Sequence, residues 1–189
     1  MTTTSTEAGQ AAHNPVVRAT ETAPVSARAD ASPAPLWADL TATFFHIGNI
    51  RPGPGTWAAT ATLLLWVAVA ALLPTHSRLT VAVIAAIAAT AIGIPASSRV
   101  ARACGKKDPS NVVIDEVAGQ LIAMIGVPLA WKPLLVSLVL FRILDITKPT
   151  PLRRLEHLPG GVGIMMDDVG AGLYALAIMH TLLHFGLLS

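Results

Sequence analysis

Beyond about residue 35, the chain alternates long apolar runs with short polar segments that are rich in Pro and Gly. A helix needs about 20 apolar residues to cross a hydrocarbon core of about 30 Å, and the first two runs reach or nearly reach that length. The stretches predicted to be helices cover residues 56–73, 79–95, 108–128, 133–144 and 164–188. The pattern therefore predicts an all-α, polytopic helical membrane bundle with about five crossings.

Prolines, glycines and capping residues set the expected helix ends. A short amphipathic helix at 36–47 is expected to stop before the turn at 49–55, whose Pro and Gly residues no helix can cross. The third membrane helix is expected to begin near Asp108, because Asp or Ser can cap a helix and Pro suits its first turn. The fourth stretch, 133–144, would rise only about 18 Å, so we expect it to be re-entrant or tucked inside the bundle.

The first 35 residues differ from the rest of the chain in amino-acid composition. They are rich in Thr, Ala, Ser and Pro and contain no apolar run, so they cannot bury enough surface to offset the entropy of ordering. They also lack the apolar segment of a secretory signal peptide. We therefore predict a disordered tail, residues 1–35, followed by a membrane domain, residues 36–189.

Composition narrows the class of protein. Hydrophobic residues make up 53% of the chain and charged residues 13%, which favours a membrane protein, although a soluble all-α bundle with an apolar core remains an alternative. Nucleic acid is excluded as the main partner, because the net charge is only +2 and aromatic residues are only 5%. The single cysteine, Cys104, excludes an intrachain disulfide and a multi-thiolate zinc site.

The basic residues fall on one side of the predicted bundle. With five crossings, eleven of the 13 Lys and Arg residues lie before the first helix or in two of the connections, and only Arg78 and Lys132 lie on the opposite side. The positive-inside rule then places the N-terminus and the basic connections in the cytoplasm. Arg99, Arg102, Lys106 and Lys107 are interpreted as topology signals of this kind.

Acidic residues converge on the same cytoplasmic side. The five are Asp115 and Glu116 at the start of the third helix, Asp145 at the end of the fourth, and Asp167 and Asp168 at the start of the fifth. A lone Asp at a helix start is often only a cap, but five carboxylates near hydrocarbon repel one another unless a cation neutralises them. Hard oxygen ligands favour Mg²⁺, Mn²⁺ or Ca²⁺ over zinc.

Cations and glycines near these acids are candidates for phosphate binding. Arg142, Lys148 and Arg153 flank Asp145, where they could hold phosphoryl oxygens or simply form ion pairs. Gly160 and Gly161 precede a helix start, where free N–H groups could hold a phosphate, although glycine also marks any tight turn.

Four ordered blocks of sequence resemble a known family. They run from Arg51 to Trp57, from Asp108 to Glu116, from Phe141 to Arg153 and from Gly160 to Asp168 with Ala171-Gly172 after it. Together they are similar to phosphatidylglycerophosphatase A. The chain departs from the family pattern at Ala58-Ala59, where Gly-Ser is expected, and at Thr147 and Thr150, where aromatic residues are common.

The resemblance implies a Mg²⁺-dependent lipid phosphatase of the bacterial inner membrane that acts in phospholipid biosynthesis. Its partner would be a phospholipid substrate, phosphatidylglycerophosphate, which it would convert to phosphatidylglycerol and phosphate. The five carboxylates would be catalytic and bind the metal, and Arg51 would join Arg142, Lys148, Arg153, Gly160 and Gly161 in binding the substrate.

Two other functions remain open from the residues alone, because intramembrane acids also mark ion pathways. One is a membrane cation transporter, which would need polar groups along the whole membrane, whereas the outer halves of these helices are almost wholly apolar. The other is a metal-stabilised membrane scaffold. For a phosphatase we expect attack by water rather than an aspartyl-phosphate intermediate, because the chain has no Asp-x-Asp-x-Thr element.

Overall fold

The computed structural model describes residues 33–188, and within that range it contains helices and connections but no strand. The helices are α1 (Leu36–Ala42), the 3₁₀ helix η2 (Ile47–Asn49), α2 (Pro54–Leu72), α3 (Thr75–Cys104), α4 (Ile114–Ala123), α5 (Trp131–Thr147), α6 (Leu152–Leu155) and α7 (Gly161–His184). The predicted tail, residues 1–35, lies almost entirely outside the described residues.

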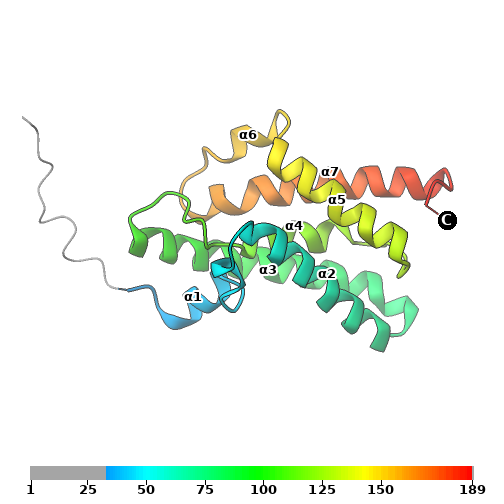
Figure 1. The fold of residues 1–189 in the computed structure, drawn as a ribbon, viewed down its shortest axis with the longest axis horizontal. Helices are drawn as coiled ribbons and strands as arrows, with labels where there is room; N and C mark the ends of the chain where they lie inside the picture. Colours follow the sequence, from blue (N-terminus) through cyan, green and yellow to red (C-terminus); the bar gives the residue numbers. More distant parts are fainter. Residues whose placement is uncertain (1–32, 189) are drawn as a thin grey trace, which may run out of the picture. The chain divides into compact units, whose positions relative to one another are not determined.

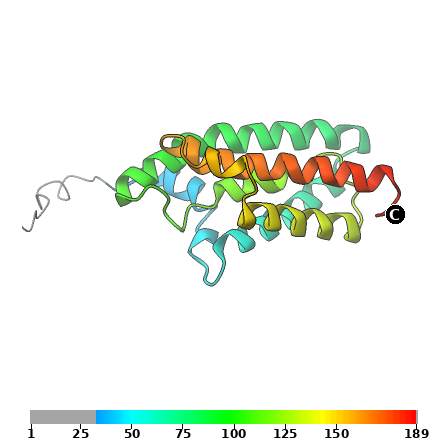
Figure 2. The ribbon, with the colours of Figure 1, turned by 90° about the horizontal axis from the view of Figure 1, so that it is seen from above.

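Short helix α4 forms the centre of the bundle, and the long helices α2, α3, α5 and α7 surround it (Figures 1 and 2). It packs against all four, and no residue of α4 is exposed. The buried residues of α4 are Ile114, Val117, Ala118, Gly119, Gln120, Ile122 and Ala123. The hydrophobic core therefore follows α4 along the bundle axis.

The outer surface of the bundle is apolar. Helices α2, α3 and α7 are each long and apolar enough to cross a membrane, and the 17 residues of α5 rise about 25 Å. The four helices expose large aliphatic side chains that include Leu64, Leu65, Ile84, Ile87, Leu135, Val139, Leu173 and Ile178. Such a surface suits contact with lipid rather than water, so the predicted all-helical membrane bundle is confirmed.

The third predicted helix is much shorter than expected. It was expected at 108–128, whereas α4 covers Ile114–Ala123. Before it, the N–H of Val113 donates to the carbonyl of Ala42 at 2.8 Å, so this amide joins the connection to α1 instead of a helix. After it, Gly126 takes a left-handed backbone conformation with φ +74°. The short central element is thus the third helix rather than the fourth, and α5 extends beyond the predicted 133–144 in both directions.

Helix α3 is longer than predicted, because it continues through Pro95 to Cys104. A proline inside a helix costs about 3 kcal/mol through a lost hydrogen bond and a steric clash. Beyond it, Ala96, Val100 and Ala101 are buried in the same core cluster as residues of α1 and α4. This packing holds the helix together past the proline, and Gly105 at φ +62° then ends it.

Two glycines bring α4 and α7 into direct backbone contact. A Cβ at Gly172 would lie 2.5 Å from the carbonyl oxygen of Gly119, and a Cβ at Gly119 would lie 2.7 Å from that of Asp168. Small residues allow this close approach between helices in membranes. The contact holds the first turn of α4 and the acids of α7 at the same end of the bundle.

Candidate active site and metal-binding cluster

A cavity of about 300 Å³ opens at the end of the bundle where α4 and α7 begin and where α3 and α5 end. Its charged lining residues are Lys107, Asp108, Asp115, Glu116, Asp145, Lys148, Glu156, Asp167 and Asp168. Seven of the eight acidic residues in the described part of the chain are therefore in the wall of one cavity. The convergence of charges predicted from the sequence is present in the structure.

Three of these acids form a cluster with the spacing of metal ligands. Asp115, Glu116 and Asp168 each offer one carboxylate oxygen, and the three oxygens lie within 4.8 Å of one another. Asp115 and Glu116 lie in the first turn of α4, and Asp168 lies on α7. The close approach of these helices at Gly119 and Gly172 brings the three carboxylates together.

Several carboxylate oxygens in this region lack a hydrogen-bond partner among the described residues. Glu116 Oε2, Asp167 Oδ1 and Asp168 Oδ2 are all buried and unpaired. A buried charged oxygen without a partner is costly, and a bound cation removes that cost. The donor set is made of hard carboxylate oxygens, so the cluster fits a divalent cation that prefers oxygen ligands.

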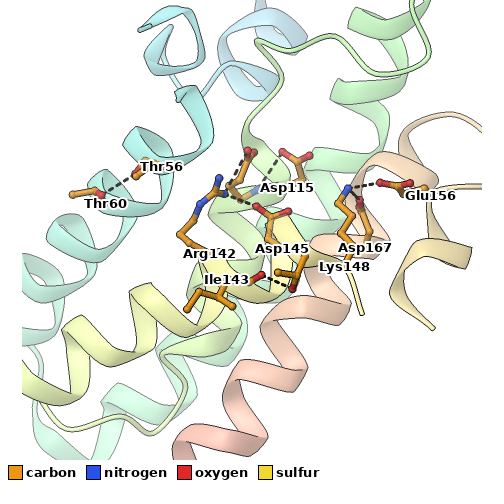
Figure 3. Close-up of polar contacts among 11 residues, drawn as sticks. Thr56, Thr60, Asp115, Arg142, Ile143, Asp145, Lys148, Glu156 and Asp167 are labelled. Carbon is orange, nitrogen blue, oxygen red and sulfur yellow. Dashed lines mark hydrogen bonds and ion pairs between the residues drawn. The ribbon is translucent and has the colours of Figure 1, made fainter. Parts of the chain in front are cut away.

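Arg142 connects two carboxylates across α4 and α5. Its Nη1 lies 2.6 Å from Asp145 Oδ2, one turn along α5, and 3.8 Å from Glu116 Oε1 (Figure 3). Gly55, at the start of α2, leaves room for this arrangement, because a Cβ there would collide with the Glu116 carboxylate and lie 3.0 Å from Arg142 Nη1. The glycine-rich turn therefore packs directly against the acidic cluster.

Lys148 forms a second ion-paired group at the end of α5. Its Nζ lies 2.5 Å from Asp167 Oδ2 and also donates a hydrogen bond to Glu156 (Figure 3). Burial alone would lower the pKa of Lys148, but the hydrogen bonds to Asp167 and Glu156 outweigh it and raise the pKa above its usual value. The hydrogen bond from Lys148 also lowers the pKa of Glu156. Lys148 therefore stays a cation in the cavity wall.

The five predicted carboxylates thus fall into two groups. Asp115, Glu116 and Asp168 form the cluster with metal-ligand spacing. Asp145 and Asp167 are each closely paired with a cation, although Oδ1 of Asp167 stays free of hydrogen bonds within residues 33–188. Glu116 belongs to the cluster and also makes the longer contact of 3.8 Å with Arg142. A catalytic or metal-binding role for all five stays a prediction.

Gly160 and Gly161, predicted to hold phosphate, occupy different surroundings. Gly160 lines the cavity. The N–H of Gly161 already donates to Ser98 Oγ at 2.8 Å, and a Cβ at Gly161 would collide with the backbone of Ile94. Gly161 therefore serves the close packing of α7 on α3, and its amide is not free for a phosphate in this structure.

The three predicted substrate-binding arginines, Arg51, Arg142 and Arg153, are not among the residues that line the cavity. Arg142 reaches the cavity wall through its contacts with Asp145 and Glu116. The guanidinium of Arg51 donates to Ser110 Oγ at 2.8 Å, and Ser110 does line the cavity, so Arg51 reaches its rim. Arg153 lies on α6 and is exposed, and its side chain forms no ion pair within residues 33–188. Substrate binding by all three arginines stays a prediction.

Sequence reasoning missed Glu156, which lines the cavity and binds Lys148. It is the one acid in the connection between Asp145 and Asp167, and both ends of that connection lie at the cavity. This topology was the signal that could have identified it. Lys107, interpreted only as a topology signal, also lines the cavity.

Comparison with known proteins is consistent with this geometry. Residues 40–183 match the phosphatidylglycerophosphatase A family. A protein of Bacteroides thetaiotaomicron with the provisional name phosphatidylinositol-3-phosphatase is 37% identical over 74% of this chain and 89% of its own length. The phosphatidylglycerophosphatase A of Haemophilus influenzae is 34% identical over 74% of this chain and 85% of its own, and that of Escherichia coli is 35% identical over 52% and 60%. No solved structure matches the chain. The chain is an enzyme and belongs to the phosphatidylglycerophosphatase A family.

Proposed function

We propose that this protein is a Mg²⁺-dependent lipid phosphatase that hydrolyses phosphatidylglycerophosphate to phosphatidylglycerol and inorganic phosphate in phospholipid biosynthesis. The observation that carries the proposal is the cluster of Asp115, Glu116 and Asp168, which lines a cavity at one end of an apolar bundle and in which Glu116 Oε2 and Asp168 Oδ2 have no hydrogen-bond partner among residues 33–188. Two relatives are named for this activity, and a third is named for another lipid phosphatase. The substrates in both names are membrane lipids with a phosphomonoester on the headgroup.

The residues of the cavity suit hydrolysis of a phosphomonoester. Asp115, Glu116 and Asp168 would hold Mg²⁺, which when bound neutralises phosphoryl charge and makes water more acidic. Lys148, kept cationic by its acidic neighbours, would bind a phosphoryl oxygen. Asp167, whose buried Oδ1 has no hydrogen-bond partner in the described structure, would accept a proton from the attacking water.

The reaction balances with water as the only co-reactant. The water oxygen forms a new bond to phosphorus, and the bond from phosphorus to the glycerol oxygen of the lipid breaks. The water gives up its proton to the site, and the leaving glycerol oxygen takes one up, so the products are an alcohol and inorganic phosphate. Water remains the proposed nucleophile, because the chain has no Asp-x-Asp-x-Thr element.

We further propose a multi-pass position in the bacterial inner membrane, with the cavity and the N-terminus in the cytoplasm. Lys107 and Lys148 line the cavity, and the basic connections lie at the same end, whereas Arg78 and Lys132 lie near the opposite ends of their helices. The positive-inside rule supports this orientation. A cytoplasmic cavity would also give access to a lipid made on the inner leaflet.

A cation transporter has less support in this structure. An ion pathway needs polar groups along the membrane, but seven of the eight acids in residues 33–188 line the cavity at one end. Deeper in the bundle the described polar residues include the neutral pair Gln120 and Ser137, with Gln120 Nε2 3.3 Å from Ser137 Oγ. One short neutral pair does not make a continuous ion pathway.

The direct test is phosphate release from phosphatidylglycerophosphate by the purified full chain in neutral detergent micelles. We expect turnover with Mg²⁺, its loss in EDTA, and recovery when Mg²⁺ is added back in excess. Phosphatidylinositol 3-phosphate, tested in the same micelles, distinguishes the two activities for which relatives are named. Release that is unaffected by EDTA, or no release from phosphatidylglycerophosphate, would contradict the proposal.

A further inference from the structure

A second hollow of about 370 Å³ adjoins the catalytic cavity. Its lining includes Ser98, Arg102, Gly105, Lys106, Lys107 and Gly160. Lys107 and Gly160 line both spaces, so the two hollows share a wall. No acidic residue is part of this second lining, which we call the basic pocket.

The cations of the basic pocket differ from those that contact the acids. Lys148, which lines the catalytic cavity, and Arg142, which contacts two of its acids, are each held by carboxylates. In contrast, the side chains of Arg102, Lys106 and Lys107 form no ion pair with any residue between 33 and 188. The pocket therefore carries positive charge without an ion-paired carboxylate in the described chain, although Lys107 lies near enough to Glu156 to help lower the pKa of that carboxyl.

The backbone around the pocket explains how these cations gather. Gly105, at φ +62°, reverses the chain after α3, and the N–H of Lys106 donates back to the carbonyl of Ala101 at 3.1 Å. On the other side, α7 begins at Gly161, and its N-cap residue Gly160 lies in the shared wall, so the positive end of a 24-residue helix lies there, although the Gly161 amide already donates to Ser98 Oγ. The side chains of Arg102, Lys106 and Lys107 are exposed to solvent. A topology signal requires only that cations lie near the membrane, and it does not require them to gather at one pocket.

We propose that the basic pocket binds the phosphodiester of the lipid substrate while the phosphomonoester lies in the catalytic cavity. This inference rests on the proposed function. Phosphatidylglycerophosphate carries both groups, joined by one glycerol. The acidic cavity would hold the monoester through the metal, and the adjoining basic pocket would hold the diester directly through its cations. Arg102 and Lys106 would then determine specificity, because phosphatidic acid has the monoester but no separate diester.

The test compares these two lipids, with the same acyl chains, in micelles of a zwitterionic detergent with Mg²⁺. The variant is R102Q/K106Q, and the matched control is R154Q, an exposed cation on α6 that lines neither hollow. We expect kcat/KM for phosphatidylglycerophosphate to fall about tenfold or more in the double variant, on the scale of losing charge-assisted contacts. Hydrolysis of phosphatidic acid should change less than about twofold, and the control should retain both activities.

Inhibition gives a second measurement that separates a lipid diester from free phosphate. Phosphatidylglycerol keeps only the diester, so its inhibition constant should rise about tenfold in R102Q/K106Q, whereas that of inorganic phosphate should stay unchanged. The diester site would be overturned if R102Q/K106Q lost kcat/KM equally on both lipids, or if inorganic phosphate inhibited this variant more weakly than the wild type. Either result would leave the proposed phosphatase activity intact. A wild-type protein that hydrolyses neither lipid would overturn the proposed function itself, and the diester site with it.

Discussion

Counter-charges divide the carboxylates of the cavity according to what each can do. Asp145 and Asp167 each have a cation within 2.6 Å. The carboxylates of Asp115, Glu116 and Asp168 lie around one gap within 4.8 Å of one another, and among residues 33–188 only the longer contact of 3.8 Å between Glu116 and Arg142 offsets their repulsion. Adding a divalent cation to that gap relieves repulsion, whereas adding one beside Lys148 would oppose an existing charge. The distribution of arginine and lysine therefore selects the metal-binding end of the cavity.

Removing a carboxylate from the cluster should separate catalysis from stability. We expect D168N and E116Q to lower turnover at least about a hundredfold, because the metal stabilises charge in the transition state. Without metal, D168N should not unfold more easily than the wild type, since it loses a repulsive buried charge, whereas E116Q also loses the ion pair with Arg142. Mg²⁺ should raise the unfolding temperature of the wild type and of D39N, a control outside the cavity, but not that of D168N or E116Q. Full activity in either variant would exclude the cluster as the metal site.

The ion pair of Lys148 and Glu156 should depend on pH in a defined direction. The stabilisation that depends on ionised Glu156 is complete above the unfolded pKa of about 4.3, and it is lost as the pH falls through the lowered pKa of the folded protein. The stabilisation that depends on protonated Lys148 is complete below about pH 10.4, and it is lost as the pH rises through the raised pKa of the folded protein. The pair should therefore be intact between about pH 5 and about pH 10.

The pH range in which this ion pair stabilises the fold can be measured by comparing the thermal unfolding of E156Q and the wild type at several pH values. Because the Glu156 side chain is 43% exposed, we expect a difference of only about 0.2–1 kcal/mol, constant from about pH 6 to 9 and smaller below about pH 4. In a K148M background the E156Q change should have no further effect. A difference that grows on acidification would mean that Glu156 acts through another partner.

At the residue level, the sequence was sufficient to identify the acids but not their pairing. Asp115, Asp145 and Asp168 could be recognised because each lies near an end of an apolar run. Which acid pairs with Arg142 or Lys148 depends on the rotation of each helix about its axis, and periodicity alone does not determine that rotation. Glu156 was missed because it lies in an irregular connection.

Helix boundaries show which sequence signals can be outweighed by packing. Pro95 and the basic residues after it suggested an end to α3, but contacts of Ala96 and Val100 with the core carry the helix further. The Asp-Pro-Ser signal near 108 suggested a helix start, but the backbone there bonds to α1 instead. Local signals located the apolar runs well, and tertiary contacts set the ends.

The contact between α4 and α7 should be intolerant of side-chain volume. In G119L the new side chain would meet the Phe141 ring and the backbone of Asp168, so we expect a loss of stability of about 1–3 kcal/mol or more, together with loss of activity. The control A88L adds a similar volume on the exposed face of α3 and should be neutral. Unfolding temperature in detergent and phosphate release would report both effects. Wild-type behaviour of G119L would show that the helices can separate without cost.

At the scale of the whole molecule, the alternation of apolar runs predicted the class of fold correctly. Within residues 33–188, three helices are long and apolar enough to cross a membrane. The predicted count of about five crossings therefore depends on whether α4 and α5 also cross. The orientation in the membrane stays a prediction, because the fold is compatible with either direction and only the charge distribution distinguishes them.

Cysteine labelling can determine that orientation. The native Cys104 is exposed and must first be replaced by serine. A cysteine at Lys106, beside the cavity, should then react with a membrane-impermeant reagent only in permeabilised cells, whereas one at Trp131, which is exposed at the start of α5, should react in intact cells. The reverse pattern would place the active site outside the cytoplasm.

The enclosure of α4 has a consequence for how the protein is made. Its ten residues rise about 15 Å, half of a hydrocarbon core, and the backbone after it needs partners from elsewhere, such as His180 of α7, which donates to the carbonyl of Ile125 at 2.9 Å. Such a segment cannot insert stably into lipid until the helices that pack against it are present. Helix α7 follows α4 in the chain, so it is synthesised later, and it supplies both this partner and Asp168. A chain that stops before α7 would therefore leave α4 incompletely covered and would lack a carboxylate of the proposed metal site, so correct insertion and the onset of catalysis would depend on the same later helix.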